Sequence, residues 1–168
     1  MTEVTFYLED ETEDSSRQHR EDFVCQLLSR HAKQAYKILL LCQNQEQAER
    51  IDDACFSQKL TQFTPHYLSG ENNSYGCNVE FSWIGAKITL NRGFLLINLA
   101  ENTANFSQNF QQVVDFVPTN EKLKQLARVR YRDYQKLRCS IMTCKLNPID
   151  NELAKVEKAN NHGKNIQS

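Results

Sequence analysis

The order of apolar and polar stretches in the first third of the chain predicts alternating strands and helices. Residues 4–8 (VTFYL) are β-branched and aromatic, which is typical of a short strand. Residues 17–33 then place apolar side chains at helical spacing, and 37–42 (KILLLC) form a continuous apolar run, as in a strand buried on both faces. Residues 44–55 combine strong helix formers with apolar positions at helical spacing. Strand, helix, strand and helix in this order favour an α/β layer with parallel strands.

The middle of the chain is richer in turn residues and in short strand-like segments. Residues 62–76 include Pro65 and two glycines, so we expect mostly a loop, with 65–68 as a candidate short strand. The strand-like segments that follow are 79–84 (VEFSWI), 87–91 (KITLN), 94–100 (FLLINLA) and 113–117 (VVDFV). The first three are close enough in sequence for two of them to form an antiparallel hairpin, and 104–111 is a candidate short helix.

A long helix is predicted over residues 121–138, with Asn120 as its candidate N-cap. Residues 140–146 (SIMTCKL) form either a last edge strand or an extension docked on the domain. From residue 147 the chain is polar and loses its apolar period, so 147–168 are expected to be a disordered or partly helical tail. We therefore predict one Rossmann-like α/β domain over residues 1–146, with a mostly parallel central sheet flanked by helices and no nucleotide-binding loop.

Composition supports a single folded domain, and the distribution of charge adds a distinctive feature. The 168 residues are 40% hydrophobic and 24% charged, as in ordinary globular proteins. The formal net charge of -1 argues against a dedicated nucleic-acid binder, which would normally be basic. However, residues 1–16 carry six acidic side chains and no basic one, whereas 121–138 carry seven basic side chains against two acidic ones. The protein is nearly neutral overall and strongly basic along one helix.

The six cysteines and the N-terminus predict a reducing, cytoplasmic location. The first residues, MTEVTFYLEDE, lack the basic start and apolar core of a signal peptide. Cys25 and Cys42 lie in apolar runs, where a free thiol behaves as a small core residue. There is no CxxC pair, so we expect no structural metal. The longest apolar runs are far shorter than the roughly 18 residues needed to cross a bilayer, so no membrane association is expected.

No known catalytic motif is present. The first loop between a strand and a helix, EDETEDSSR, is acidic and lacks glycine, so it would repel a phosphate group. The sequences GxGxxG, GxxxxGKS/T and GxSxG are missing. His66 is the histidine expected to be partly buried, and a hydrogen-bonded packing role is favoured over catalysis. We expect a protein that is not an enzyme and needs no cofactor, with a degenerate nucleotide-binding enzyme as a weaker alternative.

The basic helix is amphipathic, with a cationic and aromatic outer face. At 100° per residue, four side chains share that face: Lys124, Arg128, Tyr131 and Arg132. Few acidic residues are placed to neutralise it, and an exposed aromatic among cations suits a partner with negative charge and an apolar group. An ordinary solvated helix surface is the alternative interpretation. Arg130 projects toward the apolar side, where we expect it to be half-buried and paired with an acid, Asp115 being the candidate.

Several motifs together resemble the chi subunit family of bacterial DNA polymerase III. They are TFYL with its acidic continuation, PHYLSGE after Phe63, FLLINLA, and VVDFVP followed by LKQLARVRYRDY. They extend over residues 4–138, and the VVDFVP and LKQLARVRY block is the most specific. The resemblance implies a non-catalytic subunit in the clamp-loader part of the holoenzyme. It would pair one-to-one with the psi subunit and bind the acidic C-terminal tail of single-stranded DNA-binding protein.

The resemblance also implies where that tail binds. The tail is rich in aspartate and ends in Pro-Phe with a free carboxylate, which suits a basic face with an apolar notch. Arg128 would bind the carboxylate, and Lys124 and Arg132 would attract the aspartates. Tyr131 and Val117 would form the notch. The family has a further basic residue where this chain has Gln135, and the segment CSIMTCKL departs from the family's C-terminal sequence.

For psi, the resemblance points to a different region: Phe56, Phe63, Pro65 and His66. An exposed aromatic patch would suit a stable interface, and the alternative is that both phenylalanines belong to the core. A helicase is a further candidate partner at this psi surface. The competing function is direct nucleic-acid binding by helix 121–138, against which stand the small size of the basic patch and the acidic N-terminal stretch.

Overall fold

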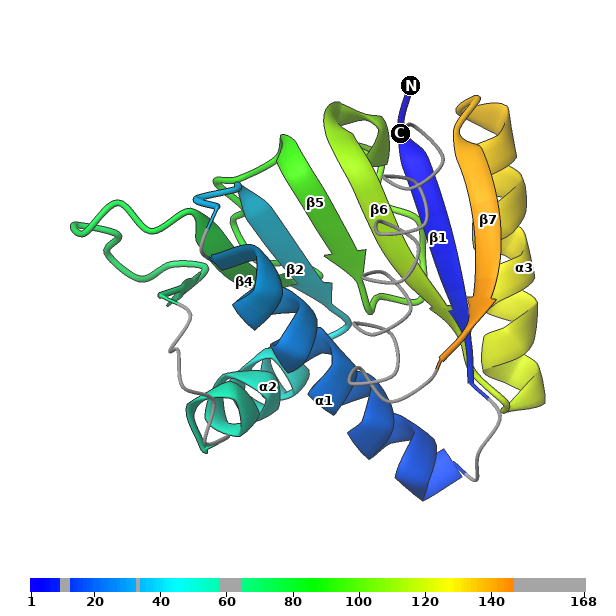
Figure 1. Cartoon of the computed structure of the whole chain (residues 1–168), viewed down its shortest axis with the longest axis horizontal. Coiled ribbons are helices and arrows are strands. Elements are labelled where there is room, and N and C mark those ends of the chain that lie inside the picture. Colours follow the sequence, from blue (N-terminus) through cyan, green and yellow to red (C-terminus); the bar gives the residue numbers. More distant parts are fainter. Residues whose placement is uncertain (10–12, 33, 58–64, 147–168) are drawn as a thin grey trace, which may run out of the picture.

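The computed structural model describes residues 1–9, 13–32, 34–57 and 65–146 (Figure 1). The strands in this part of the chain are β1 (Glu3–Leu8), β2 (Ile38–Cys42), β3 (Tyr67–Leu68), β4 (Val79–Trp83), β5 (Gly93–Asn98), β6 (Phe110–Val117) and β7 (Ser140–Lys145). The α-helices are α1 (Glu13–Ala32), α2 (Gln45–Ser57) and α3 (Glu121–Lys136), and Ser107–Asn109 form a short 3-10 helix. The predicted tail, residues 147–168, lies outside the described residues.

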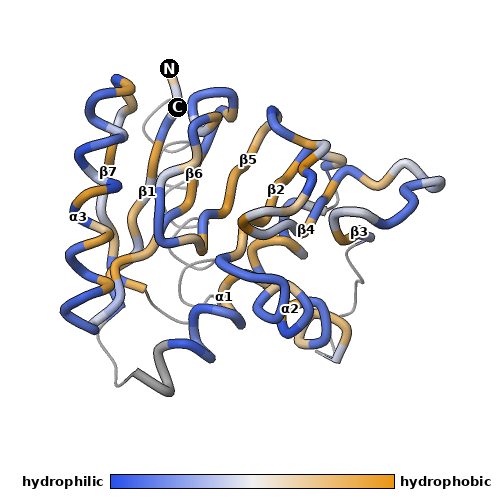
Figure 2. The backbone as a smooth tube through the Cα atoms, turned by 180° about the vertical axis from the view of Figure 1, so that it is seen from behind, coloured by the Kyte–Doolittle hydropathy of each residue, from blue (hydrophilic) through white to orange (hydrophobic). Residues whose placement is uncertain are grey.

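The described strands form one sheet in the order β3-β4-β2-β5-β6-β1-β7, and every pairing between them is parallel. This confirms the predicted α/β class. β2 is an interior strand between β4 and β5, and all five of its residues are buried, as its continuous apolar sequence indicates. Figure 2 shows hydrophobic residues concentrated along β2 and β5, whereas they alternate with hydrophilic ones along α3.

The helices cover the sheet on both faces, with α1 and α2 on one side and α3 on the other (Figure 1). Successive side chains of a strand point to opposite faces, so β2 contributes to two separate cores. Ile38 and Leu40 pack in the core under α1 and α2, whereas Leu39 and Leu41 pack in the core that includes Tyr134 of α3. α3 packs against β6 and β7, and its Tyr131 and Tyr134 rings lie against Phe6 of β1.

The predicted hairpin among residues 79–100 is wrong. β4 and β5 both pair in parallel with β2, on opposite sides of it, and residues 87–91 do not form a strand. Ile88 and Leu90 pack against the core on the α3 side, while the backbone N–H of Leu90 donates to the Glu80 carboxylate at 2.9 Å. The alternation of apolar and polar residues over 87–91 therefore belongs to a loop whose apolar side chains cover the core. The helix expected at 104–111 is the short 3-10 turn. Of the two alternatives for residues 140–146, the structure shows the edge strand, β7.

Two cysteines differ from the expectation of free thiols. Cys25 on α1 and Cys55 on α2 form a disulfide, with their Cα atoms 5.3 Å apart, because the two helices pack side by side. Cys42 is a free thiol in the core, as predicted, and burial raises its pKa to about 12. None of the helices in the described segments is long and apolar enough to span a membrane. No cluster of metal-ligating side chains occurs among the same residues.

Candidate functional site

Helix α3 is held at both ends by local interactions. The Asn120 side chain accepts a hydrogen bond from the backbone N–H of Leu123 at 3.1 Å, which is the predicted N-cap. At the other end, Arg138 adopts a positive φ of 61°, and the N–H of Cys139 bonds to the carbonyl of Tyr134. The chain thus turns directly from α3 into β7. The side of the helix that carries Lys124, Arg128 and Tyr131 therefore lies beside this edge strand.

A groove of about 300 Å³ lies between α3 and the ends of β1, β6 and β7. Its lining comes from β1, β6, α3 and β7 and is mostly apolar. The lining residues are Phe6, Leu8, Val117, Ala127, Tyr131 and Thr143, together with the cationic side chains Lys124 and Arg128. Phe6 is buried beneath it, and the ring of Tyr131 lies 5.6 Å from the Phe6 ring while remaining 38% exposed. The groove therefore offers an aromatic surface beside two positive charges. We call it the α3 groove.

The positive charge of the α3 groove is weakly compensated. Lys124 Nζ lies 3.7 Å from the exposed carboxylate of Glu121, a contact of little energetic weight in water. Arg128 and Arg132 are exposed, and neither forms an ion pair with any residue that the structure describes. An anionic ligand at the groove would thus meet unneutralised charge.

The structure brings four of the five residues predicted for the tail site together in the α3 groove. These are Val117, Lys124, Arg128 and Tyr131, whereas Arg132 is exposed on α3 without lining the groove. Sequence reasoning missed Phe6, Leu8 and Thr143. The strand pattern of residues 4–8 marks Phe6 as a core candidate, but nothing local indicates that α3 packs above it. Gln135 is exposed and does not line the groove either.

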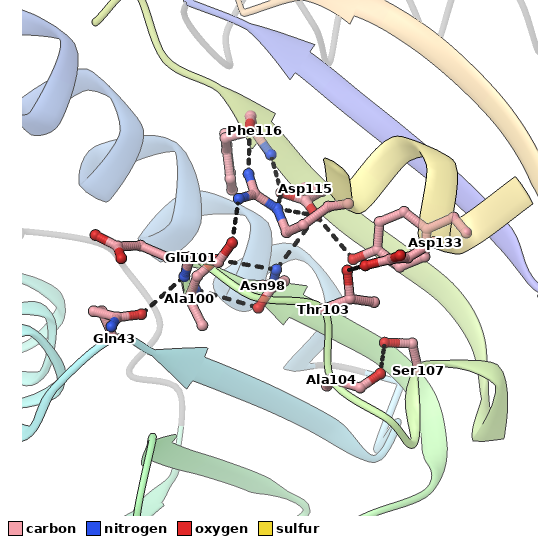
Figure 3. A network of polar contacts seen from close by, with 12 residues as sticks. Gln43, Asn98, Ala100, Glu101, Thr103, Ala104, Ser107, Asp115, Phe116 and Asp133 are labelled. Carbon is pink, nitrogen blue, oxygen red and sulfur yellow. Dashed lines mark hydrogen bonds and ion pairs between the residues drawn. The ribbon is translucent and has the colours of Figure 1, made fainter. Parts of the chain in front are cut away.

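Arg130 forms the centre of a buried polar network on the inner side of α3. Figure 3 labels its partners Glu101, Asp115 and Phe116. Its Nε donates to Asp115 Oδ2 at 3.0 Å, and its two terminal nitrogens donate to the carbonyls of Glu101 and Phe116 at 2.8 and 3.0 Å. Tyr134 donates its hydroxyl to Asp115 Oδ2 at 2.8 Å. The predicted pairing with Asp115 is confirmed, but Arg130 is only 5% exposed and so more deeply buried than expected. Arg130 is so deeply buried because its hydrogen-bond partners lie on β6 and in the segment after β5, both of which α3 covers.

A smaller cavity of about 180 Å³, with a mixed polar and apolar lining, lies at the carboxyl ends of the strands, a common ligand position in α/β folds. Its lining includes Arg20, Gln43 and Asn98. These side chains already bond to neighbouring groups: Gln43 accepts from the N–H of Glu101 at 2.8 Å, and Arg20 Nε donates to Glu9 at 2.8 Å. Burial nevertheless raises the pKa of Glu9, an effect that Arg20 only partly offsets. Asp115 and Arg130 also line this cavity, so its polar side chains serve the structural network described above.

The residues predicted for psi do not form one exposed patch. Phe56, at the end of α2, is 77% exposed, and Pro65 is exposed as well. The side chain of His66 is only 4% exposed; its ring stacks on Phe81 at 4.1 Å, and Nε2 lies 2.5 Å from Asp52 Oδ1. His66 is therefore the hydrogen-bonded packing residue that the sequence favoured. Phe63 lies outside the described residues.

Comparison with known proteins supplies a family. A family model described as "DNA polymerase III chi subunit, HolC" matches residues 1–142. The chain is 37% identical over 136 residues to a protein of Escherichia coli K12 named "DNA polymerase III subunit chi", covering 80% of this chain and 92% of that one. A protein of the same name from Haemophilus influenzae is 39% identical over 112 residues, covering 67% and 77%.

Solved structures with a similar fold are much more distant in sequence. T4 UvsW superposes with a TM-score of 0.59 at 10% identity, over 87% of this chain and 42% of that one. Saccharomyces cerevisiae Dbp5, bound to RNA and ADP BeF3, superposes with a TM-score of 0.57 at 7% identity, over 94% and 45%. This chain spans less than half the length of either structure. At such identities the likeness concerns the fold alone.

Proposed function

The chain belongs to the DNA polymerase III chi subunit family, and we propose that it acts as a non-catalytic adaptor in the polymerase III holoenzyme. In this proposal one surface holds the psi subunit, and through psi the clamp loader. The α3 groove binds the acidic C-terminal tail of single-stranded DNA-binding protein. The adaptor thereby links the clamp loader to the coated lagging-strand template in the bacterial cytoplasm.

One observation carries the tail assignment: an apolar groove with an aromatic floor lies directly beside two weakly compensated cations. A terminal phenylalanine ring would lie against Phe6, Val117 and Tyr131, where burial of apolar surface favours binding. Its carboxylate would accept two parallel hydrogen bonds from the Arg128 guanidinium. Aspartates farther from the end of the tail would be attracted by Lys124 and Arg132.

The psi surface in this proposal is the region around Phe56 and Pro65. An exposed phenylalanine is a suitable anchor for a pocket on a partner. Phe56 belongs to α2, which covers the opposite face of the sheet from α3, so psi and the tail would not compete. His66 would contribute by holding residues 65–68 in place rather than by contact, and a helicase would compete for the same surface. Phe56→Ala should reduce co-purification with psi while leaving tail binding unchanged.

Calorimetry with a synthetic tail peptide tests the groove. Arg128→Ala should weaken binding by about 1.5 to 3 kcal/mol, the range for hydrogen bonds to a charged group. Lys136→Ala is the matched control, because Lys136 is an exposed cation on the same helix that does not line the groove. Wild-type affinity should fall as salt is raised. Equal affinities of the wild type and the Arg128→Ala variant would refute the assignment.

Direct nucleic-acid binding is a second candidate, favoured by the exposed side chains of Arg128 and Arg132, which form no ion pair with another described residue. A filter-binding assay with bare single-stranded DNA separates the two. Under the adaptor proposal, this protein by itself retains no bare single-stranded DNA on the filter. Tight binding of bare DNA would favour the second candidate.

A further inference from the structure

Beside the α3 groove, the sheet ends in an open edge. β7 is the last strand of the sheet and pairs only with β1 among the described residues. Ser140–Lys145 contains no proline and no bulge, and its single charged residue is Lys145 at the end. Proteins usually protect such an edge, because a row of free backbone N–H and C=O groups can pair with another chain.

The register shows which backbone groups of β7 are left over from its pairing with β1, the strand beside it among the described residues. The N–H of Ser140 bonds to the carbonyl of Thr2 at 2.9 Å, and the N–H of Leu146 bonds to that of Leu8 at 2.8 Å. In a parallel ladder alternate residues bond to the same neighbour, so Met142 and Cys144 also face β1. The N–H and C=O groups of Ile141, Thr143 and Lys145 therefore face away from the sheet.

The free edge is continuous with the α3 groove. Thr143 belongs to both, since it lines the groove with its side chain and presents its backbone at the edge. On the opposite side of α3, Asp133 accepts a hydrogen bond from Thr103, which precedes β6. The side of the helix that carries Lys124 and Arg128 consequently faces toward β7, and Arg132 is exposed to solvent one turn further along the helix.

We propose that an acidic peptide whose C-terminal residue occupies the α3 groove adds as a further strand to the free edge of β7. This inference rests on the proposed function, because the occupant is the acidic tail assigned there. Main-chain hydrogen bonds to β7 would contribute affinity, while the groove would select the side chain of the last residue.

The direction of the added strand follows from charge. Along α3, Lys124 and Arg128 lie nearer the carboxyl ends of the strands than Arg132, since α3 starts directly after β6. A peptide with its carboxylate at Arg128 and its preceding aspartates near Arg132 runs in the same direction as β7. The added strand is therefore parallel, as is every other pair in the described sheet.

Amide hydrogen exchange measured by NMR on the full chain, with and without the synthetic tail peptide, tests this arrangement. Binding should slow exchange at Ile141 and Thr143 by about tenfold or more, while Met142 and Cys144 are protected in both states. N-methylation of alternate peptide amides upstream of the terminal residues should lower affinity by about 2- to 12-fold, the scale of one hydrogen bond. Methylation of the intervening amides should have little effect.

The outcomes separate the two proposals. If the peptide binds in a manner that depends on Arg128, but Ile141 and Thr143 exchange as before and no N-methyl pattern is seen, strand addition is wrong and the groove assignment stands. If the unmodified peptide does not bind, the groove assignment fails and strand addition fails with it.

Discussion

Arg128 and Arg130 lie two positions apart on α3 and serve opposite purposes. Arg128 is exposed at the α3 groove and forms no ion pair with a described residue, whereas Arg130 is buried and bonds to a carboxylate and two backbone carbonyls. A buried charge whose donors are all satisfied has little left to offer a partner. The charge that can bind is the one that the fold leaves uncompensated.

The two arginines are also linked mechanically. Burying a guanidinium carries a large desolvation cost, which only good geometry and several hydrogen bonds can offset. Asp115 meets this need on β6, and the Glu101 carbonyl meets it after β5, so Arg130 fastens the helix to two parts of the sheet. That attachment sets the height and rotation of α3, and with them the position of Arg128 over Phe6.

The strongest test of this contrast is Asp115→Ala. The change leaves the Arg130 charge buried without its carboxylate and also removes the acceptor of the Tyr134 hydroxyl. We expect a loss of about 3 to 5 kcal/mol in the free energy of unfolding, measured with urea. Arg128→Ala should change the same quantity by no more than about 0.5 kcal/mol. Similar losses for both variants would contradict the division of roles.

Two tyrosines on the same helix allow a matched comparison. Tyr134→Phe removes a buried hydroxyl that donates to Asp115 at 2.8 Å and should cost about 1.5 to 3 kcal/mol of stability. Tyr131→Phe should cost no more than about 0.5 kcal/mol and should leave tail affinity unchanged, because the groove uses the ring. Chemical denaturation and calorimetry on both variants give the result. If Tyr131→Phe cost more stability than Tyr134→Phe, or if Tyr134→Phe alone lowered tail affinity, the assignment of the binding surface to the Tyr131 side of α3 would be wrong.

Glu80 on β4 is a second buried charge, and its surroundings predict how the stability of the protein depends on acid pH. Burial tends to raise the pKa of Glu80, but hydrogen bonds from Ser69, Thr89, Tyr67 and the Leu90 amide outweigh it, and the pKa lies below the ordinary value of 4.5. Its stabilisation is therefore present above the ordinary pKa and is lost as the pH falls through the lowered one. Wild-type stability should fall on acidification more than that of Glu80→Gln, as urea unfolding at pH 7 and pH 3 would measure. Equal losses would show that Glu80 contributes nothing to acid sensitivity.

The smallest expected effect concerns Arg132, which is exposed outside the groove. It would act on the tail only through solvent-screened attraction, so Arg132→Ala should weaken peptide binding by about 0.2 to 1 kcal/mol. The difference from wild type should shrink at high salt, as titrations at two salt concentrations would reveal. A loss as large as that of Arg128→Ala would mean that Arg132 contacts the peptide directly.

Much of this molecule could be predicted from local pattern. Helical spacing placed Lys124, Arg128 and Tyr131 on one face of a helix and turned Arg130 toward the core, where its predicted partner Asp115 was found. Such predictions succeed because a helix fixes the relative direction of side chains three and four residues apart. The same reasoning failed for residues 87–91, because period-two alternation is equally compatible with a strand and with a loop lying on a core.

The sequence by itself determined the α/β class, the long basic helix and the burial of Arg130, all of which depend on residues close together in the chain. Only the tertiary structure decided that Phe6 and Thr143 meet Tyr131 in one groove and that Cys25 meets Cys55. Thr143 and Phe6 are paired across neighbouring parallel strands although 137 positions apart in the chain. The order of strands in a sheet follows from the packing of every layer together, and no local pattern encodes it.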